Sequence, residues 1–551
     1  MRLPLMTWAV CLTVAAGCTK TGMAPDEDGG GSVEECLESN IIYNGNISLY
    51  SYNRWPSYEP VNNRRRSEII RHIGLLGGIG SREAIWNSYG SIEPISYGES
   101  FDFQYNDKVF NELSAAGLRY CLQMKVDALV VNPDDYGPQW QRNLEWYTGL
   151  LARHYGDAPL YYIPMNEPDN EGQRTDGTPA LTTGQILRVQ QVVYETLKGY
   201  NENIKVASSP LCLLQDESEY GYTSSGRQVL LAGITRYCDY FAFHKHVDIG
   251  EDGRYSETDL WRYMDEAEAA GYPRRPALVN ENGTRLTLPL VWPEATEEDA
   301  RQFKAYWIGN DLIQMKSLGL KYIVPYSLAG SLSNDGEYNI IQEDTLAGDG
   351  SYIVHRLEYD AYRELWNPFA HRLSAGINGG FEEANPDKSR GWVVSFRGRS
   401  FNGIGRVEPK EWDYVSIVRE NARSGDFCLE MRPIDFEPEA SIDSRGITAN
   451  RCRRLVEGLV PGRSYKVSAW VRLGLGEDGT SSGSPSVVLR AMGSDPLGKS
   501  RPEVSADSAG SSGDYVLLEV SFTAGNPWVV ISLEHNGEGF AWWDDVAVSM
   551  E

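Results

Sequence analysis

Short apolar runs bounded by glycine, asparagine or aspartate alternate with longer segments of helical periodicity up to about residue 373. Such runs are typical of parallel strands that are buried on both faces. We predict strands at residues 41–52, 74–79, 120–126, 160–163, 205–210, 240–243, 277–279 and 321–328. The intervening segments carry apolar residues on one helical face, and they predict helices at 62–72, 106–118, 138–155, 183–200, 256–270, 297–318 and 352–370.

This alternation predicts an α/β fold, a (β/α)8 TIM barrel over residues 40–373. A doubly wound open sheet would show similar alternation, but no Gly-x-Gly-x-x-Gly follows the first predicted strand. After residue 373 the pattern changes, because short alternating strands and turns rich in Gly, Ser and Asp replace the helices. Residues 374–551 are therefore predicted to form a β-sandwich.

Length and charge narrow the class of protein. A chain of 551 residues suits one barrel of about 250 residues or more followed by a smaller domain. The balance of 51 basic against 77 acidic residues gives a formal charge of −26, which argues against nucleic acid or an anionic membrane surface as the main partner. We expect a monomer.

The first residues have the pattern of an export signal. A basic start is followed by an apolar stretch and by small residues that precede Cys18. Residues 1–18 resemble a bacterial lipoprotein signal, in which Cys18 becomes the acylated first residue, and the Gly- and Asp-rich residues 19–39 would form a flexible tether. We predict an outer-membrane or cell-surface lipoprotein that touches the membrane only through this lipid. A plain signal peptide, leading to a periplasmic or secreted protein, is the alternative.

Six cysteines lie beyond the signal, and none of them forms a Cys-x-x-Cys pair. The sequence therefore predicts no zinc site. Cys428 and Cys452 fall in the same predicted sandwich, where they either pair in a disulfide or remain free buried thiols.

Two predicted strands end in an Asn-Glu pair. Asn166-Glu167-Pro168 follows the strand at 160–163, and Asn280-Glu281 follows the strand at 277–279. The carboxyl ends of barrel strands are where such folds gather their catalytic groups. Two carboxylates at one barrel mouth are what hydrolysis of a glycosidic bond requires. The alternative for Glu281 is a surface turn, since Asn-Gly follows it.

These motifs resemble those of the clan A retaining glycoside hydrolases, which are (β/α)8 barrels. In that clan the Glu of Asn-Glu-Pro after strand four is the acid/base, and a Glu after strand seven is the nucleophile. The resemblance implies that Glu167 is the acid/base and that Glu281 is the nucleophile. It also implies that Asn166 binds the sugar hydroxyl beside the reacting carbon, and that Arg82 lies beside the nucleophile. A structural salt bridge is the alternative for Arg82.

A retaining reaction proceeds by double displacement between two carboxyl groups about 5 to 5.5 Å apart, and it needs no cofactor. We expect the charge of the ionised nucleophile to raise the pKa of Glu167. His244 and His246 follow the sixth strand and share one face of an extended segment, so both are predicted to line the cleft, with a structural role as the alternative. Lys125 and Tyr326, near the ends of strands three and eight, are further candidates for substrate binding.

The substrate is only partly indicated. Basic residues fall at or just after strand ends and predict a positive cleft: Arg82, Lys125, His244, Lys245, His246 and Arg285. Such a cleft would suit a sulfated or acidic galactan, and the chain is similar in outline to the agarase and porphyranase family. The resemblance thus predicts an endo-acting β-glycosidase, for which a β-glucan, xylan or mannan is an alternative substrate. The alternative function is a non-catalytic surface lipoprotein that binds glycans.

Three C-terminal motifs resemble carbohydrate-binding modules of the family 4 and 9 type, which are jelly-roll sandwiches: Asn378–Glu382, Gly458–Trp470 and Trp543–Val546. Trp470 falls on the polar face of its strand, so it is predicted to be a sugar platform, with packing against a loop as the alternative. Glu382 near the start and Asp544 or Asp545 near the end of the module would hold a structural Ca²⁺. Solvated turn carboxylates are the alternative.

Overall fold

The computed structural model describes residues 40–45, 47, 59–85, 97–98, 101–124, 126, 138–169, 181–211, 225–248, 259–285, 297–329, 339–365, 373, 376–382, 384–385, 388–389, 392–397, 415–432, 449–474, 485–499, 501, 503–510, 513–536 and 539–551. The predicted signal with Cys18, the tether and Lys125 lie outside these residues. Within the described part, no helix is both long enough and apolar enough to cross a membrane.

The N-terminal part is built on parallel strands: β1 (Ile42–Tyr43), β2 (Gly80–Ala84), β3 (Arg119–Gln123), β4 (Tyr162–Ile163), β5 (Phe241–Asp248), β6 (Ala277–Arg285) and β7 (Ile323–Pro325). They pair in the orders β1-β2-β3-β4 and β5-β6-β7. Isolated parallel bridges join the two sets, through Val206 and Ala207 on one side and between Ile41 and Ile323 on the other. The parallel pairings therefore run in a closed circle, in which the predicted strand at 205–210 contributes single bridges only.

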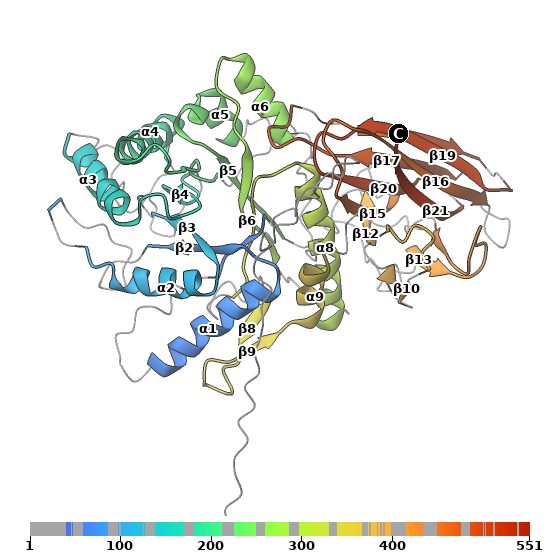
Figure 1. Ribbon diagram of the computed structural model, residues 1–551, viewed down its shortest axis with the longest axis horizontal. Coiled ribbons are helices and arrows are strands. Elements are labelled where there is room, and N and C mark those ends of the chain that lie inside the picture. The colour runs from blue at the N-terminus through green and yellow to red at the C-terminus, as the bar shows by residue number, and fades with distance from the viewer. Residues whose placement is uncertain are drawn as a thin grey trace, which may run out of the picture.

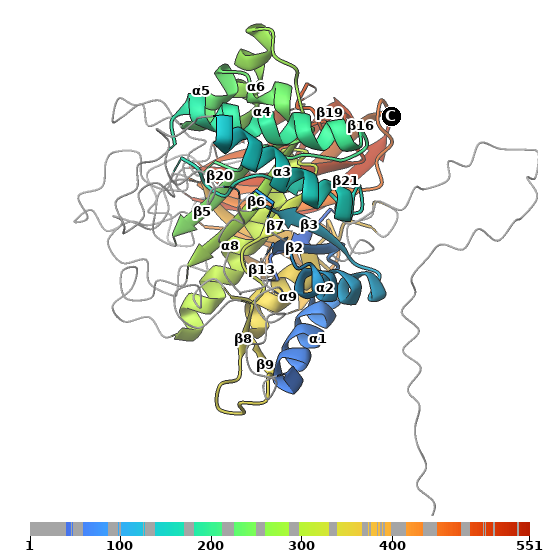
Figure 2. The ribbon, with the colours of Figure 1, turned by 90° about the vertical axis from the view of Figure 1, so that its left-hand side faces the viewer.

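Helices connect and cover these strands: α1 (Glu59–Leu75), α2 (Gln104–Ala115), α3 (Pro138–Tyr155), α4 (Thr183–Tyr200), α5 (Ser225–Leu231), the 3₁₀ helix η5 (Ile234–Tyr237), α6 (Asp259–Ala269), α8 (Glu297–Ser317) and α9 (Arg356–Leu365). α3 and α4 lie outside the strands on the side facing the viewer in Figure 2. The bounds of these two helices agree with the prediction. Proline suits the first turn of α3. α4 begins with a capping box, in which the Thr182 hydroxyl accepts from the Gln185 N–H and the Gln185 side chain accepts from the Thr182 N–H.

Several predicted elements are wrong in their limits: β5 and β6, for example, run on to Asp248 and Arg285, and two further elements change their character. The run at 74–79 was expected to be a strand, but α1 continues to Leu75 and Gly77 turns the chain with a φ of +70°, so the strand begins only at Gly80. The predicted helix at 352–370 begins as strand β9 (Tyr352–Val354), which pairs with β8 (Ile341–Glu343) as an antiparallel hairpin before α9 starts.

The C-terminal part consists of antiparallel strands: β10 (Ala384–Asn385), β11 (Lys388–Ser389), β12 (Trp392–Arg397), β13 (Val415–Val418), β14 (Cys428–Met431), β15 (Ala449–Glu457), β16 (Ser464–Gly474), β17 (Ser486–Met492), β18 (Glu503–Ala509), β19 (Val516–Thr523), β20 (Trp528–Asn536) and β21 (Phe540–Met550). Ten of them form two five-stranded sheets, ordered β12-β15-β20-β17-β18 and β13-β14-β21-β16-β19. One hydrophobic core receives side chains from both sheets. Along β16 the predicted alternation is confirmed, with Tyr465 and Val467 buried and Lys466 and Trp470 partly exposed.

The strand circle separates two apolar clusters. A small cluster, enclosed by the strands, takes residues such as Cys121, Tyr161, Ala242 and Leu278 from successive strands. The larger cluster lies between strands and helices. Because neighbouring strand residues alternate between the two clusters, a side chain at a strand end faces either the centre of the circle or a helix.

The two parts of the chain pack firmly against each other, with the C-terminal strands beside α8 (Figure 1). The Trp528 indole donates to the Lys316 carbonyl oxygen at 2.9 Å, and Arg274 donates to the Gly498 carbonyl oxygen at 3.0 Å. Gly319, at φ +69°, approaches so closely that a Cβ there would lie 2.5 Å from the Ser494 carbonyl oxygen. Leu455 joins the apolar cluster of the N-terminal part. The interface is therefore a packed core, and not a mobile linker contact.

Candidate active site

Glu281 reaches the centre of the strand circle because β6 carries a bulge. In the pairing with β5, Val279 lies opposite Phe243 but Glu281 lies opposite His244, so Asn280 is an extra residue. Strict alternation after the outward-facing Val279 would turn Glu281 toward the helices. A bulge re-aims the following side chains. Both Asn280 and Glu281 consequently face inward, and the alternative of a surface turn at Glu281 is wrong, since Asn282 and Gly283 continue the strand.

Glu167 enters the same space from the loop after β4. Its backbone has a φ of +40°, in the left-handed region that residues other than glycine seldom occupy. Such a conformation persists where the surroundings hold it, and it is found most often at functional sites. Here the Glu167 N–H donates to the Pro210 carbonyl oxygen at 3.1 Å. The backbone geometry thus fixes the direction of the carboxylate.

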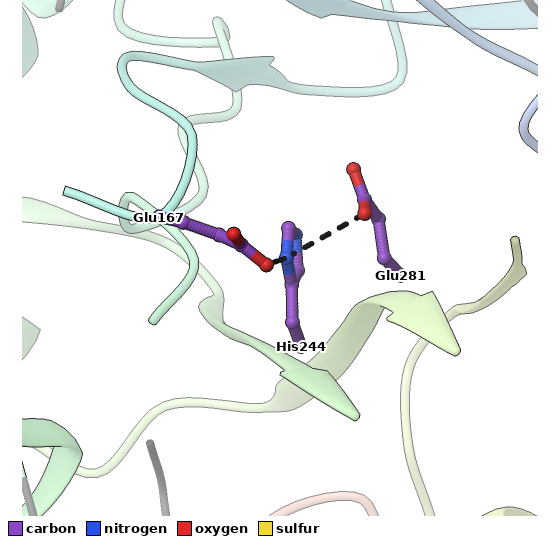
Figure 3. Close-up of side chains that lie close together, drawn as sticks. All are labelled: Glu167, His244 and Glu281. Carbon is purple, nitrogen blue, oxygen red and sulfur yellow. Dashed lines mark hydrogen bonds and ion pairs between the residues drawn. The ribbon is translucent and has the colours of Figure 1, made fainter. Parts of the chain in front are cut away.

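His244, on β5, lies between the two carboxylates (Figure 3). Its Nδ1 is 2.7 Å from Oε1 of Glu167 and 3.7 Å from Oε2 of Glu281. The ring is fully buried, whereas the two carboxylates retain a little exposure. One oxygen of each glutamate and one nitrogen of His244 lie within 4.8 Å of one another. The predicted pair of carboxylates is therefore assembled in one place.

Arg82 forms hydrogen bonds with both Glu281, the candidate nucleophile, and Asn166, which lies in the loop after β4. One guanidinium nitrogen of this nearly buried side chain donates to Oε1 of Glu281, and another donates to Oδ1 of Asn166 at 2.6 Å. An Arg–carboxylate hydrogen bond favours the ionised carboxylate. This geometry keeps Glu281 charged and turned toward its neighbours, which is what a nucleophile requires.

The chemistry of the group suits proton transfer better than metal binding. By distance alone, Glu167, His244 and Glu281 would suffice as three metal ligands. However, the guanidinium of Arg82 already neutralises Glu281. A cation at this place would meet that positive charge.

Two residues to which the sequence analysis assigned no role, Asn280 and Asp311, contact the residues of the site or their neighbours in the chain. The Asn280 side chain lies between the Tyr161 hydroxyl and Nε2 of His244. On α8, Asp311 accepts from Nζ of Lys245 at 2.5 Å and from the Asn282 amide. No local motif points to Asp311, because its role depends on how α8 packs on β5 and β6.

The remaining cleft candidates have different outcomes. Lys245 was expected to make the cleft positive, and this is wrong, because its ammonium group faces α8 and pairs with Asp311. His246 follows in β5, and Tyr326 lies half-buried just after β7, where its N–H donates to the Asn282 carbonyl oxygen at 2.8 Å. Lys125 lies outside the described residues. The direct contacts thus gather Glu167, Glu281, His244, Arg82 and Asn166.

On the C-terminal part, Trp470 lies half-buried on β16, with the Arg423 guanidinium 3.9 Å from its ring centroid. This contact agrees with the alternative for Trp470, in which the indole packs against a neighbouring loop. The Glu382 carboxylate accepts from the N–H groups of Asp426 and Phe427 at 2.9 and 3.0 Å, and Asp545 accepts from the Ser424 hydroxyl at 2.6 Å. These carboxylates are bound by protein donors.

The cysteine alternatives are resolved for the described residues. Cys121, Cys238, Cys428 and Cys452 are buried, and none of these four forms a disulfide. Burial raises the pKa of the Cys428 thiol to about 12, so it stays protonated and unreactive near neutral pH. The disulfide alternative for Cys428 and Cys452 is therefore wrong.

Comparison with known proteins gives only similarities of low sequence identity and low TM-score. No family model and no curated protein matches the chain. Among solved structures, a GH39 β-xylosidase from Caulobacter crescentus is similar at 12% identity and a TM-score of 0.41, over 93% of this chain and 98% of that one. A Thermotoga maritima β-glucosidase in complex with galacto-hydroximolactam matches at 12% identity and a TM-score of 0.42, over 60% of this chain and 94% of that one. Likenesses of this extent do not decide an activity, which has to be argued from the site.

Proposed function

We propose that this chain is a retaining, endo-acting β-glycosidase of the clan A type, with its site at the mouth of a (β/α)8 barrel. The observation that carries the proposal is the meeting of Glu167 and Glu281, whose closest ligand oxygens lie within 4.8 Å on either side of His244. Retaining glycosidases hold their carboxyl groups about 5 to 5.5 Å apart, whereas inverting enzymes need about 6.5 to 9.5 Å to admit a water molecule. The observed closeness favours retention.

The proposed reaction has two steps. In the first, Glu281 attacks the anomeric carbon while Glu167 gives its proton to the leaving glycosidic oxygen, which forms a glycosyl ester on Glu281. In the second, Glu167 takes a proton from water, the water oxygen bonds to the anomeric carbon and Glu281 leaves as a carboxylate. Arg82 holds Glu281 ionised before the first step and receives it again after the second. Asn166, held by Arg82, is placed to bind the neighbouring sugar hydroxyl.

Substitution of the two glutamates tests this assignment. Glu167→Gln and Glu281→Gln should each lower hydrolysis by several orders of magnitude while the melting temperature stays near that of the wild type. Glu145→Gln, on the exposed face of α3, is the matched control and should retain full activity. Near-normal turnover in either site variant would refute the assignment. Retention is measured separately, by following the first anomer released by NMR.

For the substrate we propose a β-linked polysaccharide, either a galactan of the agarose or porphyran type or another β-glycan. The expectation of a positive cleft, which favoured an acidic galactan, is weakened because Arg82 and Lys245 both pair with carboxylates. A panel that includes agarose, porphyran, β-glucan, xylan and mannan separates these possibilities. Activity on none of them, in a folded chain, would favour the glycan-binding alternative.

We further propose that the C-terminal part serves as a carbohydrate-binding module with a structural Ca²⁺ near Glu382 and Asp545, and that the chain is anchored by a lipid on Cys18. Motif resemblance supports the first proposal and the composition of residues 1–39 supports the second. The non-catalytic alternative is less well supported, because it gives no reason for Arg82, His244 and two carboxylates to be held in mutual contact.

A further inference from the structure

Both ring nitrogens of His244 have a polar neighbour. Nδ1 lies 2.7 Å from Oε1 of Glu167, and Nε2 lies 3.5 Å from the side-chain nitrogen of Asn280. The oxygen of the same Asn280 amide lies 3.3 Å from the Tyr161 hydroxyl. Tyr161, Asn280 and His244 are all fully buried. These four residues form one chain of polar contacts that runs from the strand interior to the proposed acid/base.

The donor and acceptor properties of these groups select one arrangement of protons. An amide nitrogen only donates and an ionised carboxylate only accepts, whereas a neutral imidazole has one donor and one acceptor nitrogen. Nε2 of His244 must then accept from Asn280, which leaves the proton on Nδ1, facing Glu167. Tyr161 keeps its hydroxyl proton, because burial raises its pKa well above the usual value of 10, and it can donate to the Asn280 oxygen. This bond favours the amide orientation that turns the nitrogen toward His244.

We propose that Asn280, oriented by Tyr161, is a positioning residue that holds His244 as the Nδ1–H tautomer and thereby decides which oxygen of Glu167 carries the catalytic proton. The inference rests on the proposed function in one respect, namely that Glu167 is the general acid. A protonated carboxyl group has one carbonyl oxygen, which accepts, and one hydroxyl oxygen, which donates. Since Nδ1–H donates to Oε1, the proton must sit on Oε2, the oxygen that points away from the imidazole ring (Figure 3).

This arrangement serves both steps of the reaction. In the first, the proton leaves Oε2 for the glycosidic oxygen as the bond to the anomeric carbon breaks, while Nδ1–H keeps its bond to Oε1. In the second, the ionised Glu167 still accepts from Nδ1–H and takes the proton of water on Oε2. The opposite tautomer would present a lone pair at Nδ1, which would accept a proton from Oε1 and draw the acid away from the leaving group.

The tautomer can be measured without any activity assay. Neutron diffraction of the full-length protein, or ¹⁵N NMR of histidine-labelled protein with the His244 signal assigned from His244→Gln, shows which nitrogen carries hydrogen at pH 7. We expect hydrogen on Nδ1 and none on Nε2. Hydrogen on Nε2, alone or together with Nδ1, would overturn the inference, and it would do so even if the chain hydrolyses no glycan.

Kinetics test the consequence for acid catalysis. Asn280→Asp keeps the side-chain shape but offers Nε2 only acceptors, and Tyr161→Phe removes the donor that orients the amide. On aryl β-glycosides of whichever sugar the wild type accepts, kcat/KM should fall by about 10- to 100-fold for Asn280→Asp when the leaving group is a poor one such as 4-methoxyphenol. With 2,4-dinitrophenol, which leaves without a proton, the loss should stay within about threefold. Tyr161→Phe should show the same selectivity at smaller size.

Tyr322→Phe is the matched control, because Tyr322 stacks on Tyr161 beside the same interior cluster, at a ring-centroid distance of 5.6 Å, and the change removes a hydroxyl while keeping that ring. It should show no dependence on the leaving group. Equal losses on both leaving groups in Asn280→Asp and Tyr161→Phe would mean a structural role and would refute the positioning role. A wild type that hydrolyses no glycoside would defeat the proposed function, and the tautomer measurement would still decide the inference.

Discussion

The ion pair between Lys245 and Asp311 offers a quantitative test of how α8 supports the site. Asp311 is 4% exposed and Lys245 is 4% exposed, and their atoms approach to 2.5 Å. The second oxygen of Asp311 accepts from the Asn282 amide. Asp311→Asn keeps the volume but removes the negative charge that Lys245 contacts, while its ammonium group stays buried.

The expected cost follows from this burial. Removing one partner of a buried ion pair costs about 3 to 5 kcal/mol, because the other charge stays desolvated. With an unfolding entropy of about 2.1 cal/mol/K per residue, a unit of roughly 330 residues has about 0.7 kcal/mol/K, so a loss of about 4 kcal/mol lowers Tm by roughly 6 °C. The exposed pair Arg64–Asp349 gives the control, since both side chains are about half exposed and Asp349→Asn should leave Tm nearly unchanged.

Differential scanning calorimetry of the full-length variants measures both effects. The double variant Lys245→Met with Asp311→Leu removes both charges and should be more stable than Asp311→Asn, since an apolar pair of similar volume replaces a buried ion pair at little cost. Activity should also fall in Asp311→Asn, mainly in kcat, because Lys245 and Asn282 adjoin His244 and Glu281 in the chain. A double variant that melts below the single one, or an Asp311→Asn variant that melts with the wild type, would refute the argument.

The remaining predictions concern Arg82, Lys316 and calcium. Arg82→Lys should lower kcat by about 10- to 100-fold, because a lysine cannot donate in a fork to two acceptors and a charge-assisted bond is worth about 1.5 to 3 kcal/mol; unchanged kcat would show that the Glu281 contact is only structural. Burial lowers the pKa of Lys316 from 10.5 to about 8, so between these values the unfolded chain binds more protons than the folded chain and stability rises with pH. Lys316→Met should raise Tm below pH 8 and flatten this rise, and an unaltered pH profile of Tm would contradict the assignment. Calcium should raise the Tm of the wild type relative to a chelator, and it should not raise the Tm of Glu382→Gln. A wild-type Tm that does not change with calcium would refute the calcium site and would mean that the Glu382 carboxylate binds only its N–H donors.

Local signals explain which elements of the fold could be predicted. The bounds of α3 and α4 agree with the prediction because a continuous amphipathic pattern coincides with a start signal at Pro138 and at Thr182. The limits of β2 were wrong because Gly74 to Ile79 combines small and apolar residues, which suit a strand and a helix end alike. Only the continuation of α1 to Leu75 and the left-handed Gly77 decide between the two.

The site residues divide in the same way, into those that local motifs predict and those that depend on packing between distant elements. Glu167, Glu281 and Arg82 lie in motifs that the sequence displays, and their mutual contact agrees with that analysis. Lys245 was misplaced although alternation gives the right answer, since the residue that follows the inward-facing His244 in a strand must face outward. Asp311 was out of reach, because its partners are 66 and 29 residues away in the chain and only the packing of α8 brings them together.

The bulge in β6 is the feature on which the whole site depends, and it is the least visible in the sequence. β6 carries one residue more than either neighbour, since Val279 and Asn282 pair with Ile323 and Pro325 on the other side. The extra residue interrupts the hydrogen-bond ladder, which is a cost in stability. In return, two consecutive side chains face the centre, so that Glu281 meets Arg82 while Asn280 contacts His244. A regular strand could supply the proposed nucleophile or the group proposed to orient the histidine, but not both from adjacent positions.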